Sequence, residues 1–424
     1  MNIIKNIKSS ELFKITSLNS INVIIKLMAG ILTSKILAVF VGPSGLAIIG
    51  NFRNFLSTVD TVTSLGFQNG IVKYVAENNE NELQYKKIIS TLFISVIIVS
   101  IFCGFGLFFF ADYWNQLIFG KEFEFSIIFK VLGIILPLYI GYGYLISIIN
   151  GFSFYKKVIY INIVGSVLGL LLTLYFVYNF LILGALLSIV FTPVVLFFVS
   201  WIISKNELSL SKNISFFSFD IDIIKNLSHY FVMIIVSGIL GQVVLIAIRN
   251  NIIDTIGIAE AGFWEAMTRI SSNYMLFLNT LLSLYFYPKL VNASNNIESK
   301  NVIWNFYKKV IPFFILGLII VFFLRVYIIQ ILFTDDFKPV SKLFLWQLIG
   351  DFFKAVSWIL GLQFFAKKMT IAFILTDVLS QLILYFSSFY FITMFGIEGV
   401  VIAQAFSYFV YFIVVSIYFR KVLF

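Results

Sequence analysis

Ten charged side chains fall within long apolar stretches of this sequence, where a charge is costly and therefore informative. Facing lipid near mid-bilayer, each would cost about 3 kcal/mol on insertion scales, and ten such costs would exceed the stability of a typical fold. Most of them must therefore face a hydrated cavity or one another. They are Lys26, Lys35, Arg53, Asp60, Glu265, Arg269, Arg325, Asp351, Lys354 and Asp377.

The sign of these charges indicates the kind of ligand. Cations outnumber carboxylates by six to four, and Arg249 adds a cation at the end of another apolar stretch. Arg and Lys in a hydrated cleft attract phosphate and pyrophosphate, whereas a cavity for cationic drugs is expected to be acidic. We therefore predict an anionic head group as the ligand.

The carboxylates in the same stretches are candidates for coupling to an ion, either H⁺ or Na⁺: they are Asp60, Glu265, Asp351 and Asp377. Simple charge balance explains their number equally well. Asp351 with Lys354, and Glu265 with Arg269, also have the spacing of in-helix ion pairs that could simply hold the bundle together. Both interpretations remain open from the sequence.

Membrane helices must position these residues. The chain is 60% hydrophobic and 12% charged, half the charge of a soluble protein at about 25%, and about 20 apolar residues suffice for one span. The sequence predicts an all-α integral membrane protein with twelve transmembrane helices in two six-helix lobes around a central cavity. The predicted spans are 12–40, 46–72, 88–111, 126–151, 158–178, 180–203, 230–248, 261–287, 310–332, 343–366, 370–395 and 399–419.

Basic residues between the spans predict the orientation. With a cytoplasmic N-terminus, nineteen Lys and Arg residues fall inside and five outside, which favours an even number of spans and two cytoplasmic termini. The N-terminal stretch lacks a cleavage site and is expected to remain as an anchor. The polar stretch 204–228 predicts a cytoplasmic linker between lobes 1–203 and 229–424.

The two halves of the chain carry matching signals. Gly184 and Lys205 bound the sixth predicted span, and Gly399 and Arg420 bound the twelfth at the same separation. Offsets near half the chain length are typical of a duplicated transporter with parallel repeats and a site between them. Duplication is therefore the favoured interpretation, although positive-inside loops could produce part of the pattern.

The sequence lacks the residues that ATP hydrolysis, disulfide formation or metal binding would need. It contains no P-loop glycine–lysine motif, so we expect no ATP hydrolysis by this chain. Cys103 and His229 are its single cysteine and histidine, so we predict no disulfide framework, metal or cofactor. The basic residues sit in short loops and set orientation, so nucleic acid is not expected as a partner. We predict a protein that is not an enzyme.

Three motifs resemble one transporter family. They are GPSGLAIIGNFRNF at 42–55, KYVAE at 73–77 and WQLIGDFFK at 346–354. In this order and spacing they resemble the O-antigen translocases, or lipid III flippases, of the polysaccharide transporter family, within the multidrug/oligosaccharidyl-lipid/polysaccharide flippase superfamily. The resemblance in length, span count and linker position covers essentially the whole chain.

The resemblance also implies site residues. Asn51 and Arg53 match the motif on the second span, Asp351 and Lys354 match the one on the tenth, and Arg249 falls where relatives tend to place a basic residue. Lys26, Glu265 and Arg269 rest on their position in the spans alone. The predicted substrate-binding set is Lys26, Asn51, Arg53, Arg249, Arg269 and Lys354.

What the resemblance implies for function is a flippase of the bacterial inner membrane. It would move an undecaprenyl-pyrophosphate-linked oligosaccharide, an O-antigen or related lipopolysaccharide unit, from the cytoplasmic to the periplasmic leaflet by alternating access. Expected partners are the bilayer, a glycan polymerase and a chain-length regulator. Alternatives are a multidrug/cation antiporter of the same architecture, a membrane-embedded glycan polymerase and a scaffold subunit of a cell-envelope complex.

Overall fold

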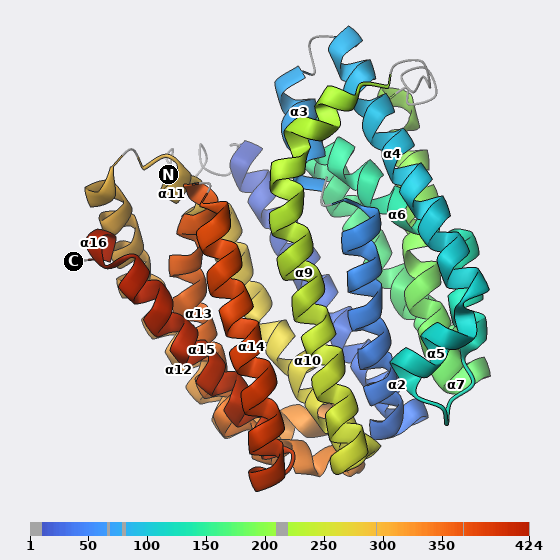
Figure 1. Ribbon diagram of the computed structural model, residues 1–424, viewed down its shortest axis with the longest axis vertical. Helices are drawn as coiled ribbons and strands as arrows, with labels where there is room; N and C mark the ends of the chain where they lie inside the picture. Colours follow the sequence, from blue (N-terminus) through green and yellow to red (C-terminus); the bar gives the residue numbers. More distant parts are fainter. Residues whose placement is uncertain are drawn as a thin grey trace, which may run out of the picture. The chain divides into compact units, whose positions relative to one another are not determined.

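Every element in the described part of the chain is helical (Figure 1). The computed structural model describes residues 11–65, 68–78, 82–208, 219–293, 295–367 and 369–423. The elements of the first half are α2 (Glu11–Thr63), α3 (Gln68–Asn78), α4 (Glu82–Phe109), α5 (Ala111–Phe119), α6 (Ser126–Gly151) and α7 (Tyr155–Leu208). Those of the second half are α9 (Ile221–Thr255), α10 (Ile258–Leu281), the π-helix η2 (Leu282–Phe286), α11 (Tyr287–Val291), α12 (Asn296–Leu332), the 3₁₀-helix η3 (Asp335–Leu343), α13 (Phe344–Ala366), α14 (Thr370–Phe395), α15 (Glu398–Tyr418) and α16 (Arg420–Leu423).

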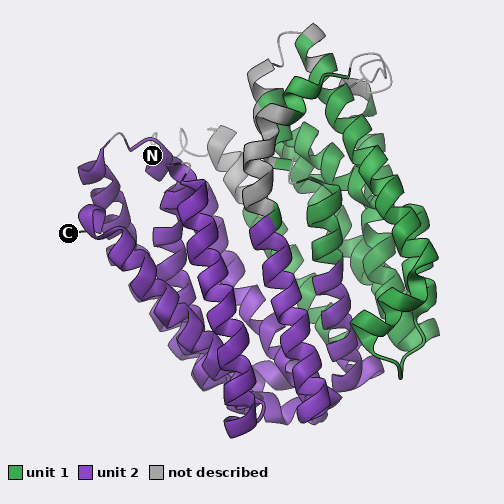
Figure 2. Ribbon diagram, in the orientation of Figure 1, with its two compact units in different colours: residues 1–36, 56–235 green, residues 37–55, 236–424 purple. Residues whose placement is uncertain are grey.

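The chain forms two compact units, drawn in different colours in Figure 2. Unit 1 comprises residues 1–36 and 56–235, and unit 2 comprises residues 37–55 and 236–424. The division between the units lies inside α9 and assigns the middle of α2 to the second unit. The linker 204–228, of which residues 209–218 lie outside the described residues, and the lobes 1–203 and 229–424 stay predictions.

Two helices are too long for single spans because each is two helices joined at a break. At about 1.5 Å per residue, the 53 residues of α2 and the 54 of α7 far exceed the hydrocarbon thickness. Gly42 interrupts α2 with a φ of 64°, and Leu181 interrupts α7 with a φ of 49°. The predicted spans on either side of each break are thus present, but 46–72 is too long, since α2 ends at Thr63 and α3 begins at Gln68.

Nine of the described helical segments are long and apolar enough to cross a membrane, including the two interrupted helices. This finding confirms an integral membrane fold. The helix α10 is not among the nine, although the sequence predicts a span at 261–287. It carries Glu260, Glu265 and Arg269, which lower its hydropathy.

The same tight turn between two helical segments occurs in both halves of the chain. Leu181 and Gly396 both have positive φ, and a glycine follows each of them three residues later, at Gly184 and Gly399. A Cβ on Gly184 would lie 1.9 Å from the carbonyl oxygen of Phe176, and one on Gly399 would lie 2.1 Å from that of Phe391. Both pairs are separated by eight residues, so the same tight turn occurs twice, and this supports the duplication that the sequence indicates.

Unit 1 packs α6 against α3, α4 and α7. Gly104 on α4 and Gly133 on α6 let these two backbones touch, because a Cβ at either position would lie within about 2.5 Å of the other residue's carbonyl oxygen. Tyr144 is buried in the core of this unit and donates a hydrogen bond from its hydroxyl to the carbonyl of Ile89 at 2.8 Å. The pairing satisfies a polar group that would otherwise be costly to bury.

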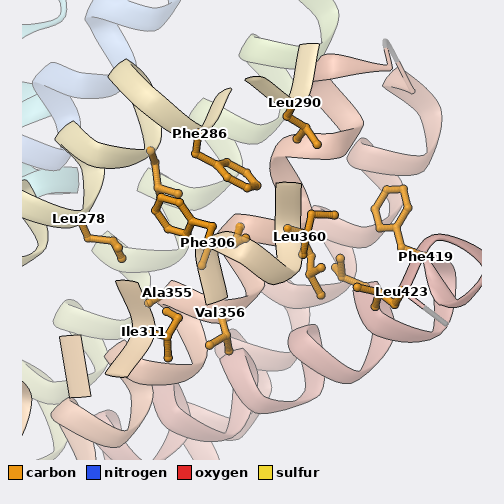
Figure 3. Close-up of a cluster of buried hydrophobic side chains, with 14 of the residues drawn as sticks. Leu278, Phe286, Leu290, Phe306, Ile311, Ala355, Val356, Leu360, Phe419 and Leu423 are labelled. Atoms are coloured by element: carbon orange, nitrogen blue, oxygen red, sulfur yellow. The ribbon is translucent and has the colours of Figure 1, made fainter. Parts of the chain in front are cut away.

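Unit 2 is centred on α13, α14 and α15, with α13 and α14 both packed against α15. Its apolar core joins residues of α10, α12, α13 and α15, including Leu278, Phe306 and Leu360 (Figure 3). Gly350 allows α13 to approach the backbone of Ala405 on α15, since a Cβ there would lie 3.2 Å from the Cα of Ala405.

Candidate functional site

Four residues of the predicted site form one buried cluster within unit 2. Asn51 comes from α2, Arg249 from α9, and Glu265 and Arg269 from α10. Their exposed fractions are only 1%, 2%, 5% and 8%. We call these four residues the arginine cluster.

One carboxylate holds both guanidinium groups of the arginine cluster. Arg249 Nη2 lies 2.9 Å from Glu265 Oε2, and Arg269 Nε lies 3.1 Å from Glu265 Oε1. The in-helix pair Glu265–Arg269 that the sequence left open is therefore formed. It is not self-contained, because Arg249 of another helix shares the same carboxylate.

Asparagines and an aromatic ring complete the positioning of Arg249. Its Nη1 donates to Asn51 Oδ1 at 3.1 Å, and Asn51 Nδ2 donates in turn to Asn250 Oδ1 at 2.8 Å. The guanidinium carbon lies 5.0 Å from the ring centroid of Trp264, within the range of a cation–π interaction. Asn51 thus positions Arg249 directly, whereas the sequence suggested only that it shares a motif with Arg53.

Glycines make this approach of helices possible. A Cβ on Gly50 would lie 2.5 Å from Glu265 Oε2 and 2.8 Å from Arg249 Cζ. A Cβ on Gly262 of α10 would lie 1.9 Å from the carbonyl oxygen of Pro43, next to the break in α2. Gly50 lies within the motif 42–55, but its role could not be predicted from the sequence, since its close contacts are with residues about 200 positions away.

The arginine cluster retains positive charge and donors without partners. Two guanidinium groups face one carboxylate, so the four residues carry a net charge of +1. Arg249 Nε, Arg269 Nη2 and the indole Nε1 of Trp264 are buried without a hydrogen-bond partner among the described residues. Leaving such a donor unsatisfied costs about 1–3 kcal/mol or more, so the arrangement is suited to accept an anionic or polar ligand.

Arg53 extends this positive charge. It lies two residues after Asn51 on α2, its side chain is exposed, and the charges of Arg269 and Glu265 act on it. Arg53 is therefore the member of the predicted set that an approaching ligand could contact first, with Arg249 and Arg269 deeper in the same unit.

Asp351 forms a second buried polar group in unit 2. Its Oδ2 accepts hydrogen bonds from Ser271 Oγ at 2.7 Å and from the hydroxyl of Tyr274, both on α10. Gln347, one turn earlier on α13, donates its Nε2 to both carboxylate oxygens at 3.2 Å. The side chain is fully buried. Gln347 lies within the motif 346–354, whereas Ser271 and Tyr274 lie on another helix and share no local sequence signal with α13.

Lys354 does not pair with Asp351, so the in-helix ion pair considered for these two residues is wrong. No ion pair joins them in the described structure, and Asp351 is instead held by neutral donors. The Lys354 ammonium lies 4.9 Å from the ring centroid of Trp358 and 5.5 Å from that of Tyr408. Aromatic faces therefore hold this half-buried cation, which leaves its charge without a bonded carboxylate.

Asp377 lies on α14 beside Ser237 of α9 and Gln381 of its own helix. Its Oδ2 is buried without a hydrogen-bond partner among the described residues. Of the coupling candidates in unit 2, Asp377 is the one with a buried carboxylate oxygen that lacks a hydrogen-bond partner among the described residues, whereas both oxygens of Glu265 and of Asp351 have partners.

The remaining predicted residues belong to unit 1. Lys26 is exposed on α2, one turn after the buried Asn22, whose Oδ1 has no hydrogen-bond partner among the described residues. Asp60 is half-buried on the same helix beyond its break, and its charge acts on Tyr139 of α6. Asp60 belongs to unit 1, whereas Arg53 belongs to unit 2.

Within the described ranges, no group of three or more His, Cys, Asp or Glu residues is placed to hold a metal ion. The polar chemistry of unit 2 is instead that of guanidinium, ammonium and amide groups together with buried carboxylates. A polytopic helical membrane protein with a cationic cluster inside one of its units is the class that these features define.

Comparison with solved structures shows the same fold in known transporters. An inward-facing multidrug resistance transporter of the MATE family, of the MOP superfamily, matches with a TM-score of 0.77 and 14% identity over 95% of this chain and 98% of that one. The lipid II flippase MurJ in an inward closed conformation matches with a TM-score of 0.72 and 14% identity over 96% and 87%. At this identity the likeness shows the fold alone.

The chain belongs to the polysaccharide biosynthesis protein family, whose model matches residues 12–294. The family resemblance drawn from the three motifs is thereby confirmed. The lipid III flippase of Escherichia coli (strain K12) is 27% identical over 392 residues, covering 92% of this chain and 93% of the relative. The lipid III flippase of Shigella flexneri matches equally well.

Proposed function

We propose that this chain is a flippase for a lipid-linked oligosaccharide, acting in the bacterial inner membrane. The cargo we propose is an undecaprenyl-pyrophosphate-linked unit of O-antigen or a related surface polysaccharide, moved from the cytoplasmic to the periplasmic leaflet. Support comes from the family, from the two lipid III flippases at 27% identity and from the fold shared with a lipid II flippase.

The observation that carries the proposal is the arginine cluster. Glu265 is the carboxylate that binds both Arg249 and Arg269, and Arg53, outside the cluster, adds a third guanidinium group in the same unit. Buried charges are normally neutralised, so a lasting surplus of cations in a membrane protein is suited to an anionic ligand. Guanidinium groups match the oxygens of phosphate in geometry as well as in charge.

The physical requirement of flipping fits this arrangement. The pyrophosphate and glycan must cross about 30 Å of hydrocarbon, where each unsatisfied polar group costs several kcal/mol, while the lipid tail can remain in the bilayer. Arg53, Arg249 and Arg269 would bind the pyrophosphate in place of water. Lys354, held over Trp358 and Tyr408, would add a cation beside aromatic surfaces that suit sugars.

We further propose twelve spans in two six-helix lobes, with both termini cytoplasmic. The nine apolar segments include α2 and α7, each interrupted once, and α10 adds one more helix. Alternating access between such lobes, joined near residues 204–228, is the mechanism that we propose for the movement of cargo. Lys26 stays a proposed substrate-binding residue on its position within the first predicted span alone.

Asp377 is the coupling residue we favour, because its Oδ2 is an acceptor without a partner in the described chain. Flipping rates measured under imposed pH or Na⁺ gradients would identify the coupling ion as H⁺ or Na⁺. A glycan polymerase and a chain-length regulator are the partners that we propose downstream, since flipped units must be polymerised at the outer face.

A cation antiporter is the second candidate, and the MATE transporters of the same fold favour it. The charge of the arginine cluster opposes it, because a buried net positive charge repels a cationic substrate. Transport of a cationic dye by purified protein, unaffected by Arg249→Ala, would support this alternative over the flippase.

Reconstitution with a labelled lipid-linked oligosaccharide tests the proposal. We expect purified protein in vesicles to move the label between leaflets, and Arg53→Ala and Lys354→Ala each to slow this movement by roughly 10- to 100-fold, the loss of one charge-assisted hydrogen bond. Lys338→Ala, which removes an exposed cation paired with Asp335, is the matched control and should retain transport.

The same variants can be tested in cells. Arg53→Ala and Lys354→Ala should abolish surface glycan while the protein still inserts into the membrane. Full complementation by both variants would defeat the assignment of a cationic substrate site.

A further inference from the structure

A second cationic site lies in unit 2, away from the arginine cluster. A cavity of about 180 Å³ opens between the end of the α10–η2–α11 segment and the first turns of α12. It is lined by Tyr285, Phe286, Lys289, Asn301, Val302, Asn305, Phe306, Lys309 and Val310. We call it the lysine pocket.

The sequence builds the polar wall of the lysine pocket by helical spacing. Asn301, Asn305 and Lys309 recur every four residues on α12 and so form one ridge. On the facing segment Tyr285 and Lys289 are also four residues apart, across the junction of the π-helix η2 and α11. Two ammonium groups, two amides and a phenol therefore converge on one small volume.

Lys289 is held in place for this role. Its Nζ donates to the Tyr285 hydroxyl at 2.8 Å and lies 4.0 Å from the centroid of the same ring. An ammonium group has three donors, so two remain for a ligand. Lys309 stands on the opposite wall with an exposed side chain. The described lining contains no carboxylate to neutralise the two cations.

The floor of the pocket is apolar. Phe286 and Phe306 are buried, and their ring centroids are 4.8 Å apart (Figure 3). Val302 and Val310 flank Phe306 on the same face of α12. A polar, cationic rim above an apolar floor matches an amphipathic molecule at the membrane surface, with its anionic group at the rim.

The size of the pocket limits what it can hold. Its volume is below the about 300–1,000 Å³ of pockets for drug-sized ligands. Lys308 and Lys309 directly precede the predicted apolar span 310–332, which places the pocket at the border of the membrane on the side predicted to be cytoplasmic. Basic pockets at this level between membrane helices are suited to phospholipid head groups.

We propose that the lysine pocket binds a single phosphate group, supplied by the head group of an anionic phospholipid. Lys289 and Lys309 contact the phosphate oxygens, Asn301 and Asn305 donate from the α12 ridge, and the acyl glycerol rests against Val302 and Val310, which are partly exposed in the pocket. This site is separate from the proposed transport site and does not depend on the cargo.

Lipid retention tests this proposal. Full-length protein would be reconstituted in mixed phosphatidylglycerol and phosphatidylcholine, re-extracted in mild detergent, and examined by native mass spectrometry for bound phosphatidylglycerol. We expect one retained phosphatidylglycerol, and about fivefold less retention for Lys309→Ala, the usual effect of one basic residue near a membrane surface. Asn305→Asp, which adds a carboxylate to the ridge, should reduce retention at least as much.

Lys308→Ala is the matched control, since this residue is an exposed lysine one position away that does not line the pocket. It should retain phosphatidylglycerol like the wild type. Equal losses in Lys308→Ala and Lys309→Ala would overturn the proposal, because they would indicate general surface charge. Retention that is unaffected by Lys309→Ala and Asn305→Asp would also overturn it.

A second arm identifies the source of the phosphate. Inorganic phosphate would be titrated against the same variants in neutral detergent. Binding of inorganic phosphate that needs Lys309, without retention of phosphatidylglycerol, would overturn the lipid as its source. Retention of phosphatidylglycerol that resists millimolar inorganic phosphate would support a head group held also through its acyl glycerol.

Discussion

Gly50 of α2 lies against the carboxylate of Glu265 on α10, so closely that a Cβ at position 50 would lie 2.5 Å from Glu265 Oε2. The same Cβ would lie 2.8 Å from Arg249 Cζ. The ion pair that joins α9 to α10 is thus packed directly onto the backbone of α2. Three helices therefore meet at one buried carboxylate.

Gly50→Ala should displace the Arg249–Glu265 pair and destabilise the protein by about 1–3 kcal/mol, as overpacking of a tight interior does. Thermal unfolding in detergent measures the effect. Gly317→Ala is the control, because a Cβ on this α12 glycine meets nothing within 4 Å, and alanine there should be neutral or slightly stabilising. Equal stability of both variants would contradict the packing described here.

Arg249→Ala should cost about 3–5 kcal/mol of stability, since it removes one partner of a buried ion pair. Arg249→Lys should rescue little, because one ammonium group cannot reproduce the separate bonds of Nη1 to Asn51 and Nη2 to Glu265. The measurements are thermal unfolding and flipping by the reconstituted protein.

The comparison for Arg249 is Lys338→Ala. The pair of Lys338 with Asp335 is exposed, with side-chain exposures of 68% and 82%, so its loss should change stability by no more than about 1 kcal/mol. Similar losses for Arg249→Ala and Lys338→Ala would show that the arginine cluster is not a desolvated network.

Tyr274→Phe should destabilise the protein by about 1–3 kcal/mol, because Asp351 loses a donor in a fully buried setting. The effect should appear as a lower unfolding temperature in detergent. Tyr327→Phe, on an exposed tyrosine of α12, is the matched control. An unfolding temperature unchanged by Tyr274→Phe would mean that the hydroxyl does not support Asp351.

Asp377→Asn should remove the response of transport to an ion gradient while leaving the fold intact. The reason is that Asp377 Oδ2 has no hydrogen-bond partner among the described residues, so a proton or Na⁺ can bind there without displacing a protein donor. Flipping rates with and without imposed pH or Na⁺ gradients provide the measurement. Gradient-driven transport by Asp377→Asn equal to that of the wild type would shift the coupling role to another carboxylate.

Arg249 and Glu265 show how far the sequence could lead toward the site. Their types and their position in apolar stretches identified them as costly and therefore informative residues. The spacing of Glu265 and Arg269 was compatible with contact on one helix, and the structure forms that contact. Spacing could not show that Arg249 of α9 shares the carboxylate, because that contact requires two helices to be packed together.

Asp351 shows the opposite outcome. The spacing of Asp351 and Lys354 was compatible with an in-helix ion pair, but local geometry only permits such a pair and does not require it. Ser271 and Tyr274 on α10 supply better donors to the buried carboxylate, while Trp358 and Tyr408 hold the ammonium. Tertiary packing selected these partners from several that the sequence allowed.

The sequence by itself determined the membrane class, most of the helices and the family. The length of an apolar stretch and a short motif are local properties, so they can be recognised without knowing how the helices pack. The sequence also determined the surplus of intramembrane cations. Only the tertiary structure decided that residues 37–55 group with the second unit, that Gly50 contacts Glu265 and that Lys289 and Lys309 line one pocket. Each of these depends on how close two helices approach, and side-chain volume and backbone contact set that distance across long separations in sequence.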